Sequence, residues 1–116
     1  MVNFEQGTDI PFTQKYRISE GIYYNLTSLA LFEIWLWTTL SDIKKFDRTG
    51  AVGYTQMRKI SDYSYEPILT GQMNELMKTG EIKMRIVWGE TNANYPDGIY
   101  DDRETICTGA YLIAKP

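Results

Sequence analysis

The chain has 116 residues, with 12 lysine and arginine residues against 15 aspartate and glutamate residues, and a formal net charge of -3. This length suits one compact domain with a single core, and the apolar content of 43% is that of a folded protein rather than a disordered one. The negative balance argues against a protein that coats nucleic acid. It leaves room for one basic face on an acidic body.

The cysteine and histidine content limits the chemistry that the chain can perform. Cys107 is the single cysteine and histidine is absent, so no disulfide can form within the chain and no Cys/His metal set exists. No glycine-rich phosphate loop is present either, so we expect no enzymatic activity and no cofactor. The sequence has no signal-peptide pattern and no apolar run of membrane-spanning length, which favours a cytoplasmic protein without a membrane partner.

Residues 1–24 are expected to form an N-terminal arm, because polar residues alternate there with Gly7, Pro11 and Gly21. At most a short strand is expected, at residues 15–18. Such an arm either packs across a partner subunit or forms a loose terminus. Residues 25–116 are expected to form the folded domain.

Residues 29–46 contain neither glycine nor proline and are expected to form the first helix. The apolar side chains that recur at intervals of three or four residues are Leu29, Phe32, Leu36, Leu40 and Ile43. Further apolar residues make this helix hydrophobic on most sides. We therefore expect either that the domain wraps around it or that part of it meets a second subunit.

A turn with a short strand is expected at residues 47–54, followed by a second helix at residues 56–63, with Met57 and Ile60 facing inward. The third helix is expected to hold Pro67 in its first turn and to end at residues 78–80, with Gly80 as the terminator. Residues 81–88 then alternate between apolar and polar side chains, and residues 105–114 supply a returning strand. The expected order is helix, short strand, helix, helix, hairpin.

This order resembles a winged helix-turn-helix domain. More narrowly, it resembles the N-terminal domains of Gram-positive plasmid replication initiators and DnaD-type phage replication proteins. The resemblance rests on LTSLALFEIWLW at residues 26–37, on TGAVGYTQM at residues 49–57, and on Leu69, Met73, Leu76, Gly80 and Ile82. It implies an α+β fold of three helices with a small antiparallel β-hairpin wing and a short first strand. Where the family usually has serine followed by arginine, lysine or glutamine, this sequence has Tyr65-Glu66-Pro67.

On such a fold, a DNA-binding surface is expected at the helix-turn-helix and at the base of the wing. Its candidate residues are Arg58, Lys59, Ser64, Tyr65, Thr70, Gln72, Asn74, Lys78, Lys83 and Arg85. The cations would contact backbone phosphates, the amide side chains could pair with adenine, and threonine could touch a thymine methyl group. The acidic wing tip, residues 90–104, is expected to avoid the phosphates.

Two functions remain open from the sequence. The first is a small sequence-specific DNA-binding accessory protein of a plasmid or phage, acting in replication, partition, conjugative transfer or transcription control. It would bind double-stranded DNA as a homodimer formed through the first helix and the N-terminal arm. The alternative is a protein–protein interaction module that has the winged-helix shape and does not bind DNA; the acidic composition and the 14% aromatic content favour this alternative.

Overall fold

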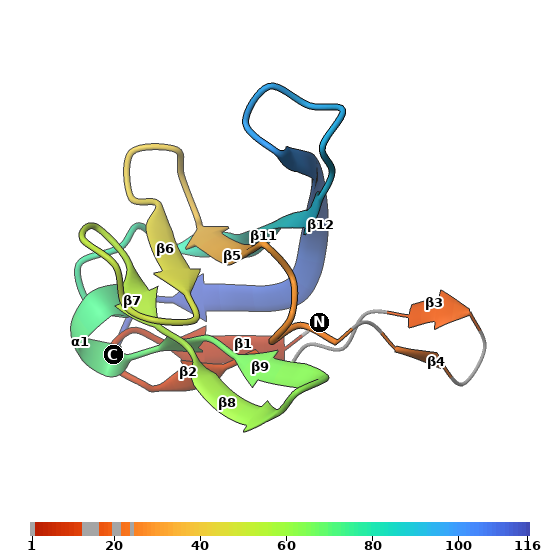
Figure 1. The fold of residues 1–116 in the computed structure, drawn as a ribbon. Coiled ribbons are helices and arrows are strands. Elements are labelled where there is room, and N and C mark those ends of the chain that lie inside the picture. The colour runs from red at the N-terminus through yellow and green to blue at the C-terminus, as the bar shows by residue number, and fades with distance from the viewer. Residues whose placement is uncertain (1, 13–16, 20–21, 24) are drawn as a thin grey trace.

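The structure, a computed structural model, describes residues 2–12, 17–19, 22–23 and 25–116, with the side chains of residues 2–12 and 25–116. In this part of the chain a curled sheet of six strands has the order β1-β12-β11-β5-β6-β7 (Figure 1). Its strands are β1 (Val2–Glu5), β5 (Leu31–Trp37), β6 (Lys44–Asp47), β7 (Thr55–Gln56), β11 (Gly80–Thr91) and β12 (Ile99–Ile113). Pairing is parallel between β1 and β12 and between β6 and β7, and antiparallel elsewhere.

Short strand pairs and a single helical turn complete the described fold. The pairs are β2 (Ile10–Pro11) with β10 (Ile68–Leu69), β3 (Arg17–Ser19) with β4 (Ile22–Tyr23), and β8 (Arg58–Ser61) with β9 (Ser64–Glu66). The helix α1 spans Gly71–Asn74. In Figure 1 the elements β2, β8 and β9 form a lower layer beneath β5, β6 and β11, at about the level of the edge strand β1, and β3–β4 project to one side.

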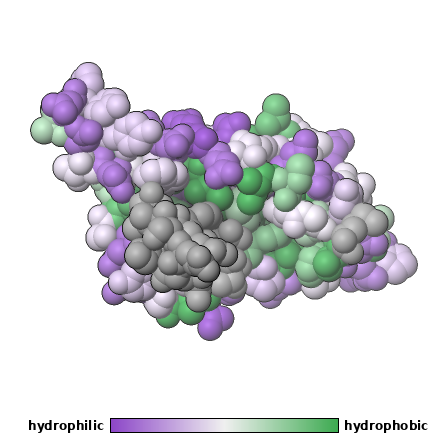
Figure 2. All heavy atoms as spheres, turned by 90° about the vertical axis from the view of Figure 1, so that its right-hand side faces the viewer, coloured by the Kyte–Doolittle hydropathy of each residue, from purple (hydrophilic) through white to green (hydrophobic). Residues whose placement is uncertain are grey.

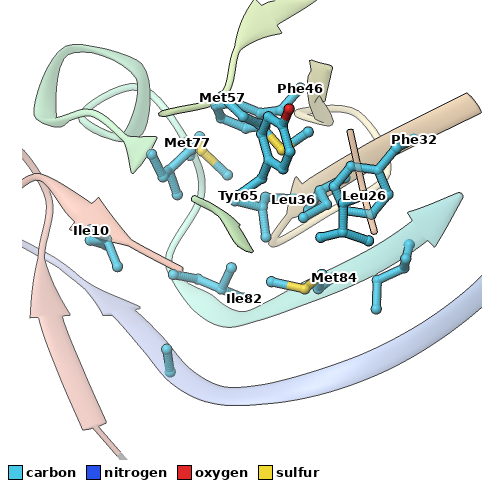
Figure 3. Packing of buried hydrophobic residues seen from close by; sticks show 14 of the residues in the cluster. Ile10, Leu26, Phe32, Leu36, Phe46, Met57, Tyr65, Met77, Ile82 and Met84 are labelled. Atoms are coloured by element: carbon cyan, nitrogen blue, oxygen red, sulfur yellow. The ribbon is translucent and has the colours of Figure 1, made fainter. Parts of the chain in front are cut away.

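The core lies between the inner face of the sheet and this lower layer. Along β5, Phe32, Ile34 and Leu36 are buried and alternate with the half-buried Leu31, Glu33 and Trp35, while Trp37 at the end of the strand is also buried. This period of two is that of a strand with one buried face. Figure 3 shows Ile82 and Met84 of the curved β11 on the side where the other labelled core residues gather. The side view in Figure 2 is largely hydrophilic, with apolar patches.

The expected helix at residues 29–46 is wrong. Those residues form β5, a turn and β6, and Leu40, which was assigned to the apolar face of the helix, is 75% exposed. The turn is closed by the carboxylate of Asp42, which accepts hydrogen bonds from the N–H and hydroxyl of Thr38 and from the N–H of Thr39. The apolar residues fit both periods, and pairing with β11 on one side and β6 on the other selects the strand.

The second and third expected helices are also wrong. Residues 55–69 form β7 to β10, and helical structure is confined to α1 in the part of the chain that the structure describes. Leu76, expected to pack inward, is 88% exposed. The strand β10 forms in place of a helix because the distant residues Ile10 and Pro11 pair with Leu69 and Ile68. A local pattern cannot show that pairing.

The winged helix-turn-helix fold is therefore contradicted, and the molecule is mostly β-structure. The hairpin expected at its C-terminal end is confirmed as β11 and β12, which pair from Gly80 with Leu112 to Thr91 with Ile99. The alternation is also confirmed, since Ile82, Met84 and Ile86 are buried and Lys83 is exposed. The dimer expected through the first helix has no structural basis, because that helix does not exist.

Residues 2–11, expected to belong to an arm, are part of the body of the domain. β1 is an edge strand of the main sheet, and Ile10 is fully buried. The strand expected at residues 15–18 falls partly outside the described residues, and β3 begins at Arg17.

Asn74 holds the N-terminal segment against α1. Its side-chain oxygen accepts a hydrogen bond from the N–H of Gly7 at 2.6 Å, and its amide donates to the carbonyls of Thr8 at 2.6 Å and Leu69 at 3.3 Å. The side chain is fully buried, so its polar atoms depend on these partners, and the bond to Leu69 is itself buried. Asn74 was expected to contact DNA; its role here is structural.

Replacing Asn74 with alanine should lower the free energy of unfolding by about 2–3 kcal/mol, because the backbone groups of Gly7, Thr8 and Leu69 lose a hydrogen-bond partner. Urea denaturation measures the change. The matched control is Gln72→Ala, on the exposed side of the same helical turn, which should change stability by less than about 0.5 kcal/mol. Equal effects of the two substitutions would contradict this role of Asn74.

Candidate nucleic-acid interface

The outer face of the sheet, which points away from the core, carries an unusual set of side chains. Its central members are Glu33, Trp35 and Trp37 of β5, Lys45 and Asp47 of β6, Lys83 and Arg85 of β11, and Arg103 and Thr105 of β12. Their strand register makes them neighbours, since Trp35 lies directly opposite Lys45 on one side and Arg85 on the other. Residues far apart in sequence thus form one surface.

Three cations surround the indole of Trp35. The Lys45 Nζ lies 4.3 Å from the ring centroid, and the guanidinium carbons of Arg85 and Arg103 lie at 5.5 and 6.0 Å. Arg85 also lies 5.7 Å from the ring of Trp37 and donates from Nε to the Thr105 hydroxyl at 3.1 Å. We call Trp35, Lys45, Arg85 and Arg103 the tryptophan cluster. Three positive charges thus gather around one aromatic ring in a chain whose net charge is -3.

Glu33 accepts hydrogen bonds from Trp35 of this cluster and from Tyr54 beside it. Its Oε1 accepts a hydrogen bond from the indole N–H of Trp35 at 3.0 Å. A hydrogen bond with Glu33, helped by burial, raises the pKa of the Tyr54 hydroxyl above its ordinary value. The ammonium of Lys45 lies 6.0 Å from the ring of Tyr54, so it sits near both rings.

Of the ten residues expected to bind DNA, only Lys83 and Arg85 lie on the outer face. Arg58, Lys59 and Thr70 lie together elsewhere, along an open groove of about 540 Å³ in the lower layer. Both cations there stand close to carboxylates, with Arg58 Nη1 3.8 Å from Glu66 and Lys59 Nζ 2.9 Å from Asp62. Lys59 therefore does not share a face with Lys83 and Arg85.

The remaining expected residues are scattered, and several are inaccessible. Ser64 and Tyr65 are buried in β9, where the Tyr65 hydroxyl is 2.9 Å from the Thr27 hydroxyl. Thr70 caps α1 by accepting a hydrogen bond from the N–H of Met73. Gln72 and Lys78 are exposed, outside the outer face.

The residues predicted from sequence do not include Trp35, Lys45, Arg103, Glu33 and Tyr54. The signal that could have found some of them is the alternation in LFEIWLW, where every second residue is a candidate for one face of a strand. No pattern in the sequence connects Lys45 or Arg103 to Trp35, because strand pairing alone brings them together.

Among residues 2–12, 17–19, 22–23 and 25–116, no group of three or more acidic or cysteine side chains is arranged to hold a metal ion. The same residues include no helix that is long and apolar enough to span a bilayer.

Comparison with models of known protein families, with curated proteins and with solved structures found no match. The resemblance to replication-protein domains thus stays a prediction from sequence, and the fold that it implied is wrong.

Replacing Glu33 with glutamine should bring the pKa of Tyr54 back toward the ordinary tyrosine value, since the neutral amide no longer favours the protonated hydroxyl through charge. Because the pKa of Tyr54 is raised in the folded state, the protonated hydroxyl stabilises the fold. This stabilisation is complete below the ordinary tyrosine pKa and is lost as the pH rises through the folded-state pKa. The measurement is a spectrophotometric titration of phenolate, with Tyr54→Phe subtracted in each background. Identical Tyr54 titrations in the unsubstituted chain and in Glu33→Gln would contradict the contact.

Proposed function

We propose that the chain binds single-stranded nucleic acid on the outer face of its sheet. The observation that carries the proposal is the tryptophan cluster, in which one indole is ringed by Lys45, Arg85 and Arg103. Unpaired bases stack on aromatic rings and on guanidinium planes, and cations beside the rings meet the phosphates. The cluster supplies both kinds of contact within a few ångströms.

The charge distribution supports this assignment. Lys45, Lys83, Arg85 and Arg103 account for four of the 12 lysine and arginine residues and share one face, while the molecule as a whole is acidic. Binding a phosphate backbone there relieves repulsion among the cations and releases counterions. Lys45, now over the Trp35 ring, would turn toward a phosphate as a base takes its place.

The geometry favours single strands over duplex DNA. The described residues provide no helix of a length that could enter a major groove. The Trp35 ring on the open sheet face can stack with unpaired bases, which are not already stacked in a duplex. Sequence-specific recognition of double-stranded DNA, a plasmid or phage role and a cytoplasmic location stay predictions from sequence.

The proposal predicts that a short labelled oligothymidine binds at low salt, and that Trp35→Leu weakens the binding about tenfold by removing the stacking surface. Arg85→Met should reduce the slope of log affinity against log salt by about 0.7, the value for one lost phosphate contact. Fluorescence anisotropy at several salt concentrations gives both quantities.

The matched control is Arg58→Met, which removes an equal charge from the lower layer and should leave the affinity and the salt slope unchanged. Absence of binding at low salt would refute the proposal. Equal loss of affinity in Arg58→Met and Arg85→Met would show that only the overall charge matters.

A second candidate function, docking of a protein partner, is favoured by the opposite side of the β11–β12 hairpin. Trp88, Tyr100, Asp102 and Glu104 share that side by their register. The rings of Trp88 and Tyr100 lie 6.4 Å apart in an edge-to-face arrangement, and Tyr95 lies 5.5 Å from Tyr100. Aromatic rings flanked by carboxylates fit a lysine- or arginine-rich segment of another protein.

This candidate predicts that a lysine-rich peptide binds and that the double substitution Tyr100→Ser/Glu104→Gln weakens its binding about tenfold. Isothermal titration calorimetry measures the affinity. Glu75→Gln, which removes one exposed carboxylate from α1's C-terminal end, is the control and should have no effect. If Glu75→Gln weakened peptide binding equally, the loss of affinity would reflect net charge alone and would contradict this candidate.

A further inference from the structure

A small cavity lies beside the tryptophan cluster, at the end of the β5–β6 ladder. The two strands are paired as far as Glu33 opposite Asp47, and a cavity of about 100 Å³ lies next to this last pair. Its lining residues are Ala30, Leu31, Phe32, Glu33, Asp47, Arg48 and Thr49. The cavity therefore shares Glu33 with the site proposed for strand binding.

The wall formed by residues 47–49 is held in place by hydrogen bonds. Asp47 Oδ1 accepts from the N–H of Gly50 at 2.6 Å and of Thr49 at 3.1 Å. Arg48 Nη1 donates to the carbonyls of Leu26 and Thr27, both at 2.8 Å. The guanidinium is thus engaged with backbone, and the cavity is formed before any ligand arrives.

Two carboxylate residues line this cavity. Glu33 and Asp47 are directly opposite in the register, and like charges in that relation destabilise a sheet. A phosphate would be repelled here, although cations surround the neighbouring ring. A neutral group that presents hydrogen-bond donors would satisfy the carboxylates instead.

The carboxylates retain capacity to accept such donors. An ionised carboxylate has about four acceptor positions, and Glu33 uses Oε1 for the indole N–H of Trp35 and one further bond for Tyr54. Asp47 uses Oδ2 only for a long 3.3 Å bond from the N–H of Ala51. A ligand edge with two adjacent donors therefore matches the free acceptor positions.

We propose that this cavity receives the Watson–Crick edge of a guanine base, so that the outer face prefers strands with guanine at the Trp35 position. The inference rests on the proposed strand binding. Guanine carries a ring N–H next to an exocyclic amino group, whereas the donors of the other three bases are flanked by acceptors. Glu33, which also orients Trp35, accepts from this edge as the base stacks on the indole.

The test compares thymine tracts that carry guanine, hypoxanthine, adenine or cytosine at one central position. A single substitution avoids the self-association of guanine runs, and hypoxanthine differs from guanine only by the missing exocyclic amino group. The guanine strand should bind about tenfold more tightly than the hypoxanthine strand, as measured by anisotropy.

Glu33→Gln should abolish this difference, since the amide accepts from the Trp35 N–H as before but has lost the carboxylate for the base edge. Glu81→Gln, a substitution on β11 away from the cavity, is the matched control and should preserve the guanine preference. If a variant fails to fold, the affinities of the guanine and hypoxanthine strands for the unsubstituted protein still test the guanine preference.

The outcomes separate the two proposals. If no strand binds at low salt, the proposed function itself fails. If all strands bind equally, or if the guanine preference survives in Glu33→Gln, strand binding stands and the guanine cavity is refuted.

Discussion

The antiparallel pairing of β5 with β11 is the constraint on which the rest of the structure depends. It runs from Trp37 opposite Lys83 to Leu31 opposite Gly89, and it joins segments that lie far apart along a chain of 116 residues. The same register places Ile34 and Ile86 together on the inner face and Trp35 and Arg85 together on the outer face. A slip of one residue would exchange the two faces of β5 and turn Trp35 into the core.

The outer face combines stabilising and destabilising contacts. Lys45, Arg85 and Arg103 repel one another, and Glu33 opposes Asp47 across the strands. The cation–π attraction of the Trp35 ring offsets part of the repulsion among the three cations. The proposed ligand, which brings phosphates to the cations and donors to the carboxylates, would relieve both conflicts. Strand binding accounts for the cations of the outer face, and the guanine cavity accounts for its carboxylates. Separate experiments test the two.

The fold could be predicted from sequence only where the residue pattern was unambiguous. In residues 81–86 apolar and polar residues alternate, and this period predicts the strand β11. In residues 29–46 the apolar residues satisfy a helical period and a strand period at once. The local pattern alone therefore favours a helix that the structure does not form. In residues 65–78 the decisive partners are Ile10 and the backbone near Gly7, which belong to the distant N-terminal segment. Of the candidate site, the sequence predicts only Lys83 and Arg85, because the pattern around its centre, Trp35, favours a helix.

By itself, the sequence determined that its C-terminal part is a hairpin and that Lys83 and Arg85 point away from the apolar side of β11. These conclusions follow from a local period of two, which is visible without knowing the partner strand. Only the tertiary structure decided that residues 29–46 are strands and that Trp35 meets Lys45, Arg85 and Arg103. Strand register joins residues that are distant in the sequence, and hydrogen bonds between distant segments choose between two local conformations that the same apolar residues permit.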